Sequence, residues 1–557
     1  MKILKEIFQY TYKHPLVLLI IIVGSILGLI PFIFDGTTGC VKEVCGFIVG
    51  TNYRDGIWYQ AVAASAFKTF PFRMPNFAGE TLTGYHYIPN LVSYILSYIG
   101  IPISVSFYQI FPLIFMLGVI IFSILFARTI FDKPAFVFFF LFFTLFGIPL
   151  TLLTSLYHKG IIDNYLLINT FQSTRVLESI HFAFSFLILL IIFLLIQKPV
   201  ITWKKRICIS FFIFLVFGIK FYTAVAIVII LGCHELFLLI KKKNFQTFFL
   251  NALSYTIGAL ISIFIFYDPL NTTNSGSIFI FAPFSTVHHI IEEPDLLYMK
   301  DMVNARYFLQ EHGWSPRLLL IELFSSVLFV VFYFGTKVIG FVYILKQILT
   351  KKITRFELSL TIALIICILL SILFIQKGDW FNPIQFAVVA AFIMNFFAAK
   401  TLYNLWQHKL YFYIIGSLIF IITIPAHFVN LNYFNNDARL VILQAEINAL
   451  TFLKQQPDGI VFAPIIDADM AYVSAFTGKQ TYVNFLNVLD NNGINYARRI
   501  AATENMETID IDKLNLHYIY IPYTYTKFEQ LKQKCITSSR YTIIYDKEQV
   551  VICEKTI

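Results

Sequence analysis

Charged residues are scarce in this sequence. Lys, Arg, Asp and Glu together make up 13% of its 557 residues, whereas hydrophobic residues make up 58%. A soluble chain carries about 25% charged residues. The shortage of charge therefore excludes a soluble globular protein and indicates a membrane protein with several spans.

The position of the basic residues argues against a nucleic-acid partner. The formal net charge is +10, but most of it lies in short loops between apolar segments, where it is a topology signal.

A cleavable signal peptide is also not indicated. The first apolar run is longer than a signal-peptide core and lacks a small-residue cleavage site, so it predicts a retained membrane anchor.

Apolar segments of roughly 17–25 residues, the length needed to cross a bilayer, recur along most of the chain. The stretch 207–240 is too long for one straight span and is interrupted at Gly218-Ile219-Lys220, which predicts a hairpin of two helices. With that pair, the sequence predicts about eleven spans. The others lie at 15–34, 105–127, 134–153, 178–196, 249–267, 317–345, 358–376, 384–402 and 411–428.

Basic residues orient these spans. Lys2 and Lys5 precede the first span, and later clusters such as Lys204-Lys205-Arg206 and Lys241-Lys242-Lys243 fall on the same side of one alternating topology. Lys and Arg are enriched in cytoplasmic loops. We therefore predict a multi-pass protein of the cell membrane with its N-terminus inside and its C-terminal tail outside.

The chain divides into a transmembrane part, 1–434, and a C-terminal part, 435–557. Long extracytoplasmic loops are expected at 35–104 and 268–316. In the C-terminal part, an amphipathic helix from Leu440 leads into alternating strand and helix patterns, including GIVFAP and HYIYIP. This predicts a small extracytoplasmic α/β domain without the GxGxxG or P-loop of a nucleotide site. We expect a lid or an acceptor-binding domain, with a structural cap as the alternative.

Four of the seven cysteines fall on the predicted outer side. Cys40 and Cys45 lie in the first loop, and Cys535 and Cys553 lie in the tail. An oxidising compartment permits a disulfide within each pair. Free thiols are the alternative.

The first loop carries the strongest candidates for catalysis. Asp55 follows the first anchor and heads the stretch WYQAVAASAF; a carboxylate there could deprotonate an acceptor or hold a metal ion. The alternative is that Asp55 only caps a helix. Tyr85-His86-Tyr87 closes the loop, with His86 as a catalytic group or metal ligand and Tyr85 as a substrate contact. The alternative is that these rings only form part of an aromatic belt at the membrane interface.

Phosphate binding is predicted at Lys220. An ammonium group between two apolar half-helices is energetically costly, and charged residues in such positions usually have a function. The alternative is that Lys220 snorkels toward the interface. Arg306 and Arg175 are further phosphate partners, and Asp163 in GIIDN is a candidate second acid.

Several segments together resemble one superfamily. These are the Asp55 loop, AGETLTGYHYIPN at 78–90, GIKFYT at 218–223, DWFNPIQF at 379–386 and SAFTGKQTYVN at 474–484. They resemble polytopic proteins of the GT-C glycosyltransferase superfamily, in bacterial branches related to protein mannosyltransferases and arabinosyltransferases. The resemblance covers most of the chain in architecture.

The resemblance implies a polyprenyl-phosphate-linked sugar donor, an active site at the outer face and often a divalent cation such as Mg or Mn. Asp55 matches the first-loop catalytic acid of the superfamily, and Asp163 would be its second-loop acid. His86 lies where relatives carry a Tyr-His pair, so Asp55 and His86 are the candidate metal ligands. A paired DxD motif is missing from this sequence.

The sequence therefore predicts an inverting sugar transfer to an extracytoplasmic acceptor. Asp55 would be the base or a metal ligand, Lys220 or Arg306 would bind the phosphate, and the tail would seat the acceptor. One rival is a flippase or transporter, which the charge in a broken helix favours, although no inverted repeat is found. The other is a non-catalytic protein that keeps the same fold.

Overall fold

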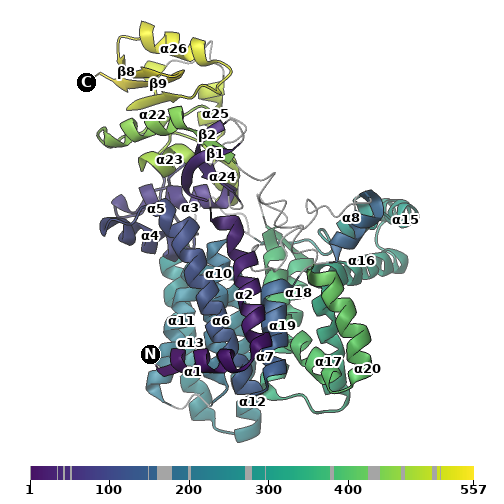
Figure 1. Ribbon diagram of the computed structural model, residues 1–557. Helices are drawn as coiled ribbons and strands as arrows, with labels where there is room; N and C mark the ends of the chain where they lie inside the picture. The colour runs from purple at the N-terminus through teal and green to yellow at the C-terminus, as the bar shows by residue number, and fades with distance from the viewer. Residues whose placement is uncertain are drawn as a thin grey trace.

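The computed structural model contains a helical bundle with an α/β unit at one end (Figure 1). The residues described are 2–33, 35–41, 44–50, 53–147, 150–159, 179–198, 202–269, 279–294, 296–376, 382–424, 440–465, 471–504, 511–514 and 516–556. The α/β unit carries the C-terminus, and a side arm that includes α8 and α15 projects from the bundle near that same end.

Mostly apolar helices of different lengths make up the bundle. They are α1 (Lys2–Lys13), α2 (Pro15–Leu29), α6 (Phe111–Ile130), α7 (Pro134–Phe146), α10 (Ile180–Ile196), α11 (Trp203–Ile219), α12 (Phe221–Lys242), α13 (Phe245–Ser262), α16 (Pro316–Phe334), α17 (Gly340–Leu349), α18 (Arg355–Leu373), α19 (Gln385–Trp406) and α20 (Lys409–Tyr411). Short π-helical turns at Ser106–Ile110, Ile263–Tyr267 and Phe412–Gly416 extend α6, α13 and α20.

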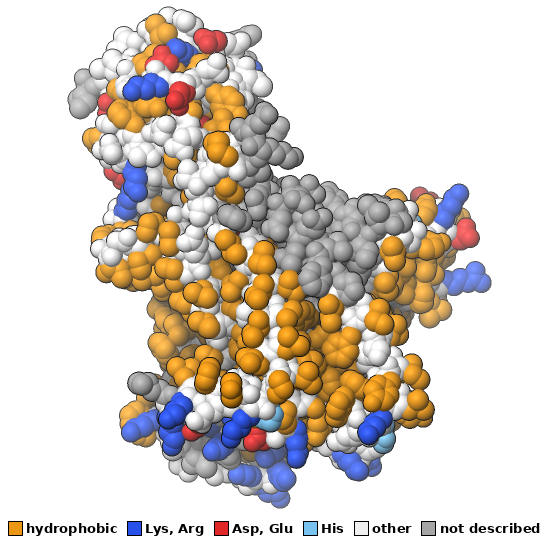
Figure 2. Space-filling model, in the orientation of Figure 1, with side chains coloured by type: hydrophobic (Ala, Val, Ile, Leu, Met, Phe, Trp, Pro, Cys, Tyr) orange, Lys and Arg blue, Asp and Glu red, His pale blue; other side chains and the backbone are white. Residues whose placement is uncertain are grey.

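Among the described residues, each of the predicted spans overlaps one or two helices of this bundle. Within the described residues, seven helices are long and apolar enough to cross a membrane, and three shorter apolar helices accompany them. Figure 2 shows a broad hydrophobic band across the visible face of the bundle, with Lys and Arg side chains gathered at the end away from the α/β unit. The protein is therefore a multi-pass membrane protein; the number of spans and their orientation stay predictions.

Helix α19 forms the centre of the bundle. Its side chains from Phe386 to Leu402 are almost all buried, and it packs against α7, α17 and α18. A helix that is apolar all round is expected in such a central position. Aromatic rings fill the space around it, with Phe396 lying 5.7 Å from both Phe126 and Phe356 between ring centroids.

The interruption predicted within 207–240 is confirmed. Helix α11 ends at Ile219 and α12 begins at Phe221, and Lys220 between them has an extended backbone. The two helices pack against each other as a hairpin. The structure thus places one buried ammonium group at the point where the chain reverses direction.

The first loop folds into a compact unit. It contains β1 (Thr37–Val41), β2 (Val44–Val49), α3 (Tyr53–Ser65), the 3-10 turn Ala66–Lys68, α4 (Ile88–Tyr98) and α5 (Ile103–Val105). Strands β1 and β2 form a hairpin in which Cys40 and Cys45 face each other and form a disulfide.

The tail begins with a strand rather than with the helix expected from Leu440. Strand β5 (Leu440–Leu443) pairs antiparallel with β2 of the first loop, and α22 (Gln444–Gln455) follows it. An apolar LVIL run has a high strand propensity, and the free edge of β2 supplies the backbone partners that the sequence pattern could not reveal. The first loop and the tail therefore share one sheet.

The rest of the tail is an α/β layer, as predicted. Its sheet has the order β6-β7-β9-β8, with β6 and β7 parallel and the other pairs antiparallel. The elements are β6 (Val461–Phe462), α23 (Tyr472–Thr477), α24 (Leu486–Asn491), α25 (Ala497–Glu504), β7 (Tyr518–Ile521), α26 (Phe528–Thr537), β8 (Tyr541–Lys547) and β9 (Val550–Lys555).

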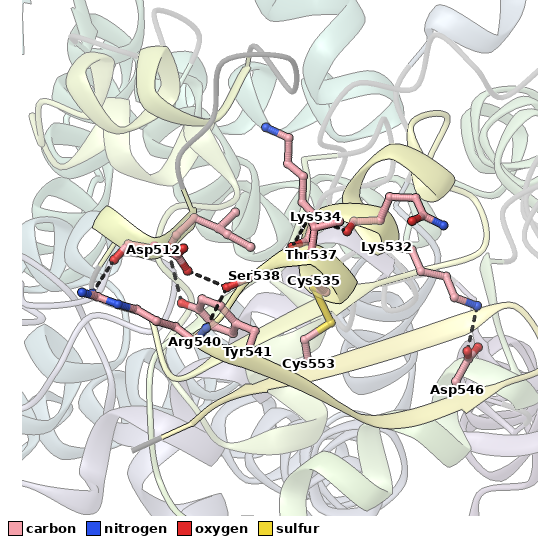
Figure 3. The surroundings of a disulfide bond; sticks show 12 residues. Asp512, Lys532, Lys534, Cys535, Thr537, Ser538, Arg540, Tyr541, Asp546 and Cys553 are labelled. Atoms are coloured by element: carbon pink, nitrogen blue, oxygen red, sulfur yellow. Dashed lines mark hydrogen bonds and ion pairs between the residues drawn. A yellow bond between two sulfur atoms is a disulfide. The ribbon is translucent and has the colours of Figure 1, made fainter.

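The second predicted cysteine pair is also joined. Cys535 on α26 forms a disulfide with Cys553 on β9, which attaches the helix to the sheet (Figure 3). An ion pair between Lys532 and Asp546, 2.7 Å apart, links the same helix to β8.

The side arm combines parts of two loops with one long helix. It contains α8 (Thr151–Lys159), α14 (His289–Glu292), α15 (Lys300–Glu311) and the first turns of α16. In addition, β3 (Phe279–Phe281) pairs antiparallel with β4 (Phe374–Gln376).

A buried carboxylate in the tail gives a pH-dependent prediction. Glu446 is buried and accepts hydrogen bonds from the hydroxyls of Tyr472, at 3.3 Å, and Tyr520, at 3.2 Å. Burial raises the pKa of Glu446 above 4.5 although both bonds oppose that rise. Because the folded state then holds the proton more tightly than the unfolded state, stability falls as pH rises from about 4.5 through the folded pKa.

Replacing Glu446 with Gln keeps the hydrogen-bond acceptor and removes the charge. We expect a thermal unfolding midpoint a few degrees higher at pH 7.5, roughly what a change of about 1 kcal/mol produces, and a smaller gain toward pH 4.5. The matched control is Glu529→Gln, an exposed residue of α26, which should leave the midpoint unchanged. Equal midpoints of wild type and Glu446→Gln at both pH values would contradict this.

Candidate functional site

Asp55 lies in the first turn of α3. Because the helix begins at Tyr53, the residue is not the N-cap, and its exposed carboxylate is close to the positive end of the helix dipole. The hydroxyl of Tyr59, one turn further on, lies 3.4 Å from Asp55 Oδ2 and donates to it. The carboxylate is thus held at one end of α3 while remaining accessible.

Tail residues hold α3 in place. Its residues from Ile57 to Ala63 are buried, and α23 of the tail packs along it. Gln60 Nε2 donates to the carbonyl of Ala475 at 3.4 Å. This close packing explains why α3 is buried on most sides.

A wall of aromatic and imidazole rings lies beside Asp55. The ring of Tyr59 lies 4.1 Å from that of His181, centroid to centroid. The His86 ring lies 5.2 Å from His181 and stacks on Tyr85 at 4.9 Å. Trp58 extends the wall with an edge contact to Tyr85 at 6.0 Å.

Hydrogen bonds fix the orientation of His181. Asn90 Nδ2 donates to the carbonyl of Tyr59 at 2.8 Å, so Asn90 Oδ1 faces His181 Nε2, which also lies at 2.8 Å. Since a carboxamide oxygen only accepts, His181 Nε2 carries a proton in this arrangement. The hydroxyl of Ser179 lies 3.1 Å from the Tyr59 hydroxyl and adds a further polar contact.

Lys220 contributes a positive charge to the same region. The residue is buried, and its Nζ lies 4.4 Å from the Phe182 ring centroid and 5.9 Å from that of Tyr222. Burial, and then the charges of Lys220 and His181, lower the pKa of His86 well below 6.5. At neutral pH, His86 is therefore a neutral group that can accept or donate a hydrogen bond.

Tyrosine side chains near Asp55 stay protonated. Burial and the Asp55 carboxylate raise the pKa of both Tyr59 and Tyr85 well above 10. These two hydroxyls are consequently donors at physiological pH rather than bases. The carboxylate of Asp55 is the group in this cluster best suited to accept a proton.

The structure brings together four residues that the sequence singled out, namely Asp55, Tyr85, His86 and Lys220. Asp163 and Arg175 lie outside the described residues. The roles proposed for all of these residues stay predictions.

Arg306 is not part of this cluster. It lies in the side arm, where its Nε contacts Glu322 at 2.6 Å and its Nη1 contacts Glu292 at 2.9 Å. Its Nη2 lies 3.1 Å from His288 Nδ1. Arg306 of α15 thus forms ion pairs with Glu292 of α14 and Glu322 of α16, and these contacts link the three helices.

Sequence reasoning missed Tyr59, Asn90, Ser179 and His181. A signal existed for two of them: Asn90 and His181 stand at the starts of apolar helices, and polar groups within such segments are costly and frequently functional. Nothing in the spacing of these residues indicated that they would meet.

The described residues do not form a complete metal site. No three His, Cys, Asp or Glu side chains converge within the part of the chain that is described, and catalytic zinc sites use three protein ligands. Asp55 and His86 belong to one cluster, but these two side chains supply only two of the three protein ligands.

The tail lies against the first loop beside this cluster. Asn76 Nδ2 donates to the carbonyls of Asn484, at 2.8 Å, and Phe485, at 3.1 Å. The Phe485 ring lies 6.1 Å from Trp58 of α3. Arg499 packs on the face of Phe77, 3.8 Å from its centroid, and its Nη2 donates to the Ala78 carbonyl at 2.7 Å. The tail therefore borders the space next to Asp55.

This architecture, a helical bundle whose first loop packs with a C-terminal α/β unit, is the GT-C fold. Solved structures that share it include the Archaeoglobus fulgidus oligosaccharyltransferase in complex with Zn and sulfate, with 13% sequence identity and a TM-score of 0.52. That match covers 96% of this chain and 73% of the other.

Two further structures of the Archaeoglobus fulgidus enzyme have the same fold. One is the oligosaccharyltransferase AglB in complex with an inhibitory peptide and a dolichol-phosphate, with 12% identity, a TM-score of 0.50, and coverage of 98% of this chain and 75% of that one. The other is tethered to an acceptor peptide, with 13% identity, a TM-score of 0.51 and the same coverage. No family model and no curated protein matches the sequence. The resemblance to the GT-C superfamily is thus confirmed at the level of the fold.

Proposed function

We propose that this protein is a membrane glycosyltransferase that transfers a sugar from a polyprenyl-phosphate-linked donor to an extracytoplasmic acceptor. The observation that carries the proposal is the meeting of an exposed carboxylate, Asp55, with neutral imidazole and buried ammonium groups in one cluster. The described parts of the first loop, the bundle and the tail all contribute to its surroundings.

The chemistry requires a base on one side of the sugar and a cation on the other. The acceptor oxygen or nitrogen attacks the anomeric carbon while the bond from that carbon to the phosphate oxygen breaks, which inverts the configuration. The acceptor loses its proton to Asp55, and the electron pair of the broken bond stays on the lipid phosphate. General-base assistance of this kind contributes about 10²–10⁴-fold to rate.

Lys220 is the group assigned to the leaving phosphate. Its ammonium is buried between the ends of α11 and α12, where a cation is costly unless it meets a negative charge. A lipid phosphate gains charge as the sugar departs, and a fixed cation stabilises that charge most strongly in a water-poor site.

The remaining residues of the cluster would orient the substrate. Neutral His86 and the hydroxyls of Tyr59 and Tyr85 can hydrogen-bond sugar hydroxyls without adding charge. The tail, which borders the space beside Trp58, is assigned to seating the acceptor. Under the predicted orientation, this cluster lies at the outer face of the membrane.

The neighbouring structures support a lipid-linked donor. An oligosaccharyltransferase of this fold binds a dolichol-phosphate together with an inhibitory peptide, and another is tethered to an acceptor peptide. A third contains Zn, which supports a divalent cation such as Mg or Mn as a cofactor of this fold.

The test is sugar transfer by the purified full-length protein in lipid. Radiolabelled sugars on polyprenyl-phosphate and polyprenyl-pyrophosphate carriers are offered with peptide, lipid and glycan acceptors. Transfer from the monophosphate donors supports the proposal. Donor translocation in liposomes without transfer would indicate a flippase, and donor binding with neither activity would indicate a non-catalytic protein of this fold.

A further inference from the structure

A second site lies at the opposite end of the bundle. A cavity of about 380 Å³ opens where α6, α10, α12, α18 and α19 converge. This volume falls within the range of ligand pockets, about 300–1,000 Å³. Its polar lining consists of Thr129, Gln197, His234, Thr354, Arg355, Glu357 and Lys400.

The cavity is remote from the Asp55 cluster. Helix α12 starts beside Lys220 of that cluster and reaches the cavity at His234, about 21 Å further on at 1.5 Å per residue. Likewise, α10 starts at the cluster next to His181 and ends at the cavity. The cavity therefore belongs to the end of the bundle where Lys and Arg side chains gather in Figure 2.

Two nitrogen atoms in this region have unused hydrogen-bonding capacity. Among the described residues, His234 Nδ1 and Arg355 Nη1 are buried and have no hydrogen-bond partner. His234 is only 6% exposed. Buried polar atoms are nearly always paired, so two such atoms lining one cavity suggest a missing ligand atom.

The charge of the lining favours an anion. The single carboxylate of the lining, Glu357, is already neutralised by Lys400 Nζ at 2.6 Å. It also accepts from the hydroxyl of Tyr343 and the backbone amide of Thr354, both at 2.8 Å. Arg355 is left as the cation of the lining that no described carboxylate pairs with.

The rest of the wall is apolar. It is formed by side chains that include Ile130, Phe131, Ile196, Phe356 and Phe396. A bare inorganic anion would leave these surfaces without a partner. A ligand that carries both a phosphate and a hydrocarbon portion matches the two halves of the lining.

We propose that this cavity binds the phosphate headgroup of an anionic membrane lipid, with its phosphate oxygens contacting Arg355 Nη1 and the His234 ring. Basic pockets between transmembrane helices are suited to anionic headgroups. The lipid comes from the leaflet adjacent to the Lys- and Arg-rich end. The site is separate from sugar transfer and does not depend on that activity.

Lipid retention by the full-length protein in detergent, measured by native mass spectrometry, tests the proposal. Phosphatidylglycerol is compared with phosphatidylcholine, and inorganic phosphate is added as a competitor. We expect phosphatidylglycerol to bind about tenfold more tightly than phosphatidylcholine, and Arg355→Gln to remove about that factor, as expected for a hydrogen bond to a charged group. Lys352→Gln, an exposed basic residue three positions earlier, is the matched control and should change nothing.

His234→Phe provides a second variant that keeps Arg355 and fills the same space. It should also weaken phosphatidylglycerol binding while leaving the thermal unfolding midpoint near that of wild type. Equal retention of the two lipids by wild type, or no effect of either variant, would overturn the proposal. Displacement of phosphatidylglycerol by equimolar inorganic phosphate would overturn a lipid as the occupant, because the apolar wall would then contribute nothing.

Discussion

Replacing Asp55 with Asn is expected to lower the turnover of sugar transfer by about 10²–10⁴-fold, the usual contribution of a general base. The amide keeps the size of the carboxylate and still accepts from the Tyr59 hydroxyl, which lies 3.4 Å from Oδ2. It cannot take the acceptor's proton. The measurement is the initial rate of transfer from a radiolabelled polyprenyl-phosphate sugar at saturating donor.

A matched variant separates this effect from a general loss of charge in the loop. Glu80 is exposed and lies in the same loop, so Glu80→Gln removes one negative charge without touching the cluster and should retain wild-type turnover. Asp55 is exposed near the start of α3, so Asp55→Asn should unfold at nearly the wild-type temperature. Undiminished transfer by Asp55→Asn would reduce this residue to a contributor to helix stability and would shift attention to Asp163.

The bundle could be predicted from the sequence because a bilayer imposes a simple rule. A segment crossing hydrocarbon must satisfy its own backbone and expose apolar side chains, so each span leaves a continuous apolar run. The break at Lys220 was visible for the same reason, since a charge within such a run has few structural explanations. The helix pair α11 and α12 therefore lies where the sequence predicted it.

The contacts within the candidate site could not be predicted in the same way. His181 meets Asn90 across 91 positions of sequence, and β5 pairs with β2 across nearly 400. Neither contact leaves a local pattern, because the partners are selected by packing of the whole chain. Asp55 could be proposed from its position after the anchor, but its neighbours Tyr59 and His181 required the structure.

Arg306 illustrates a signal that was present but not used. Glu322 lies inside the apolar run that forms α16, and a carboxylate there needs a cation close by. Arg306 supplies it at 2.6 Å. Considered together, Glu322 and Arg306 predict an ion pair with each other rather than a phosphate contact for Arg306.

Lys220 gives the second large effect. Lys220→Met keeps the apolar stem that packs near Phe182 and removes the ammonium, so we expect kcat for sugar transfer to fall by about 10²–10³-fold, as when one group that stabilises developing negative charge is lost. The KM for the lipid-linked donor should rise less, because the phosphate gains charge in the transition state. The matched control is Lys242→Met. Lys242 is exposed at the far end of α12, the helix that follows Lys220, and the variant should keep normal kinetics.

Stability distinguishes this role from a structural one. A buried ammonium is costly in a membrane protein, and replacing a buried charge by an apolar side chain of similar volume is frequently neutral or stabilising. Lys220→Met should therefore unfold at or above the wild-type temperature while being nearly inactive. A lower unfolding temperature with a proportionate loss of activity would mean that Lys220 holds the helix pair together. A charge retained at a cost to stability, and needed for turnover, is what a phosphate-binding role requires.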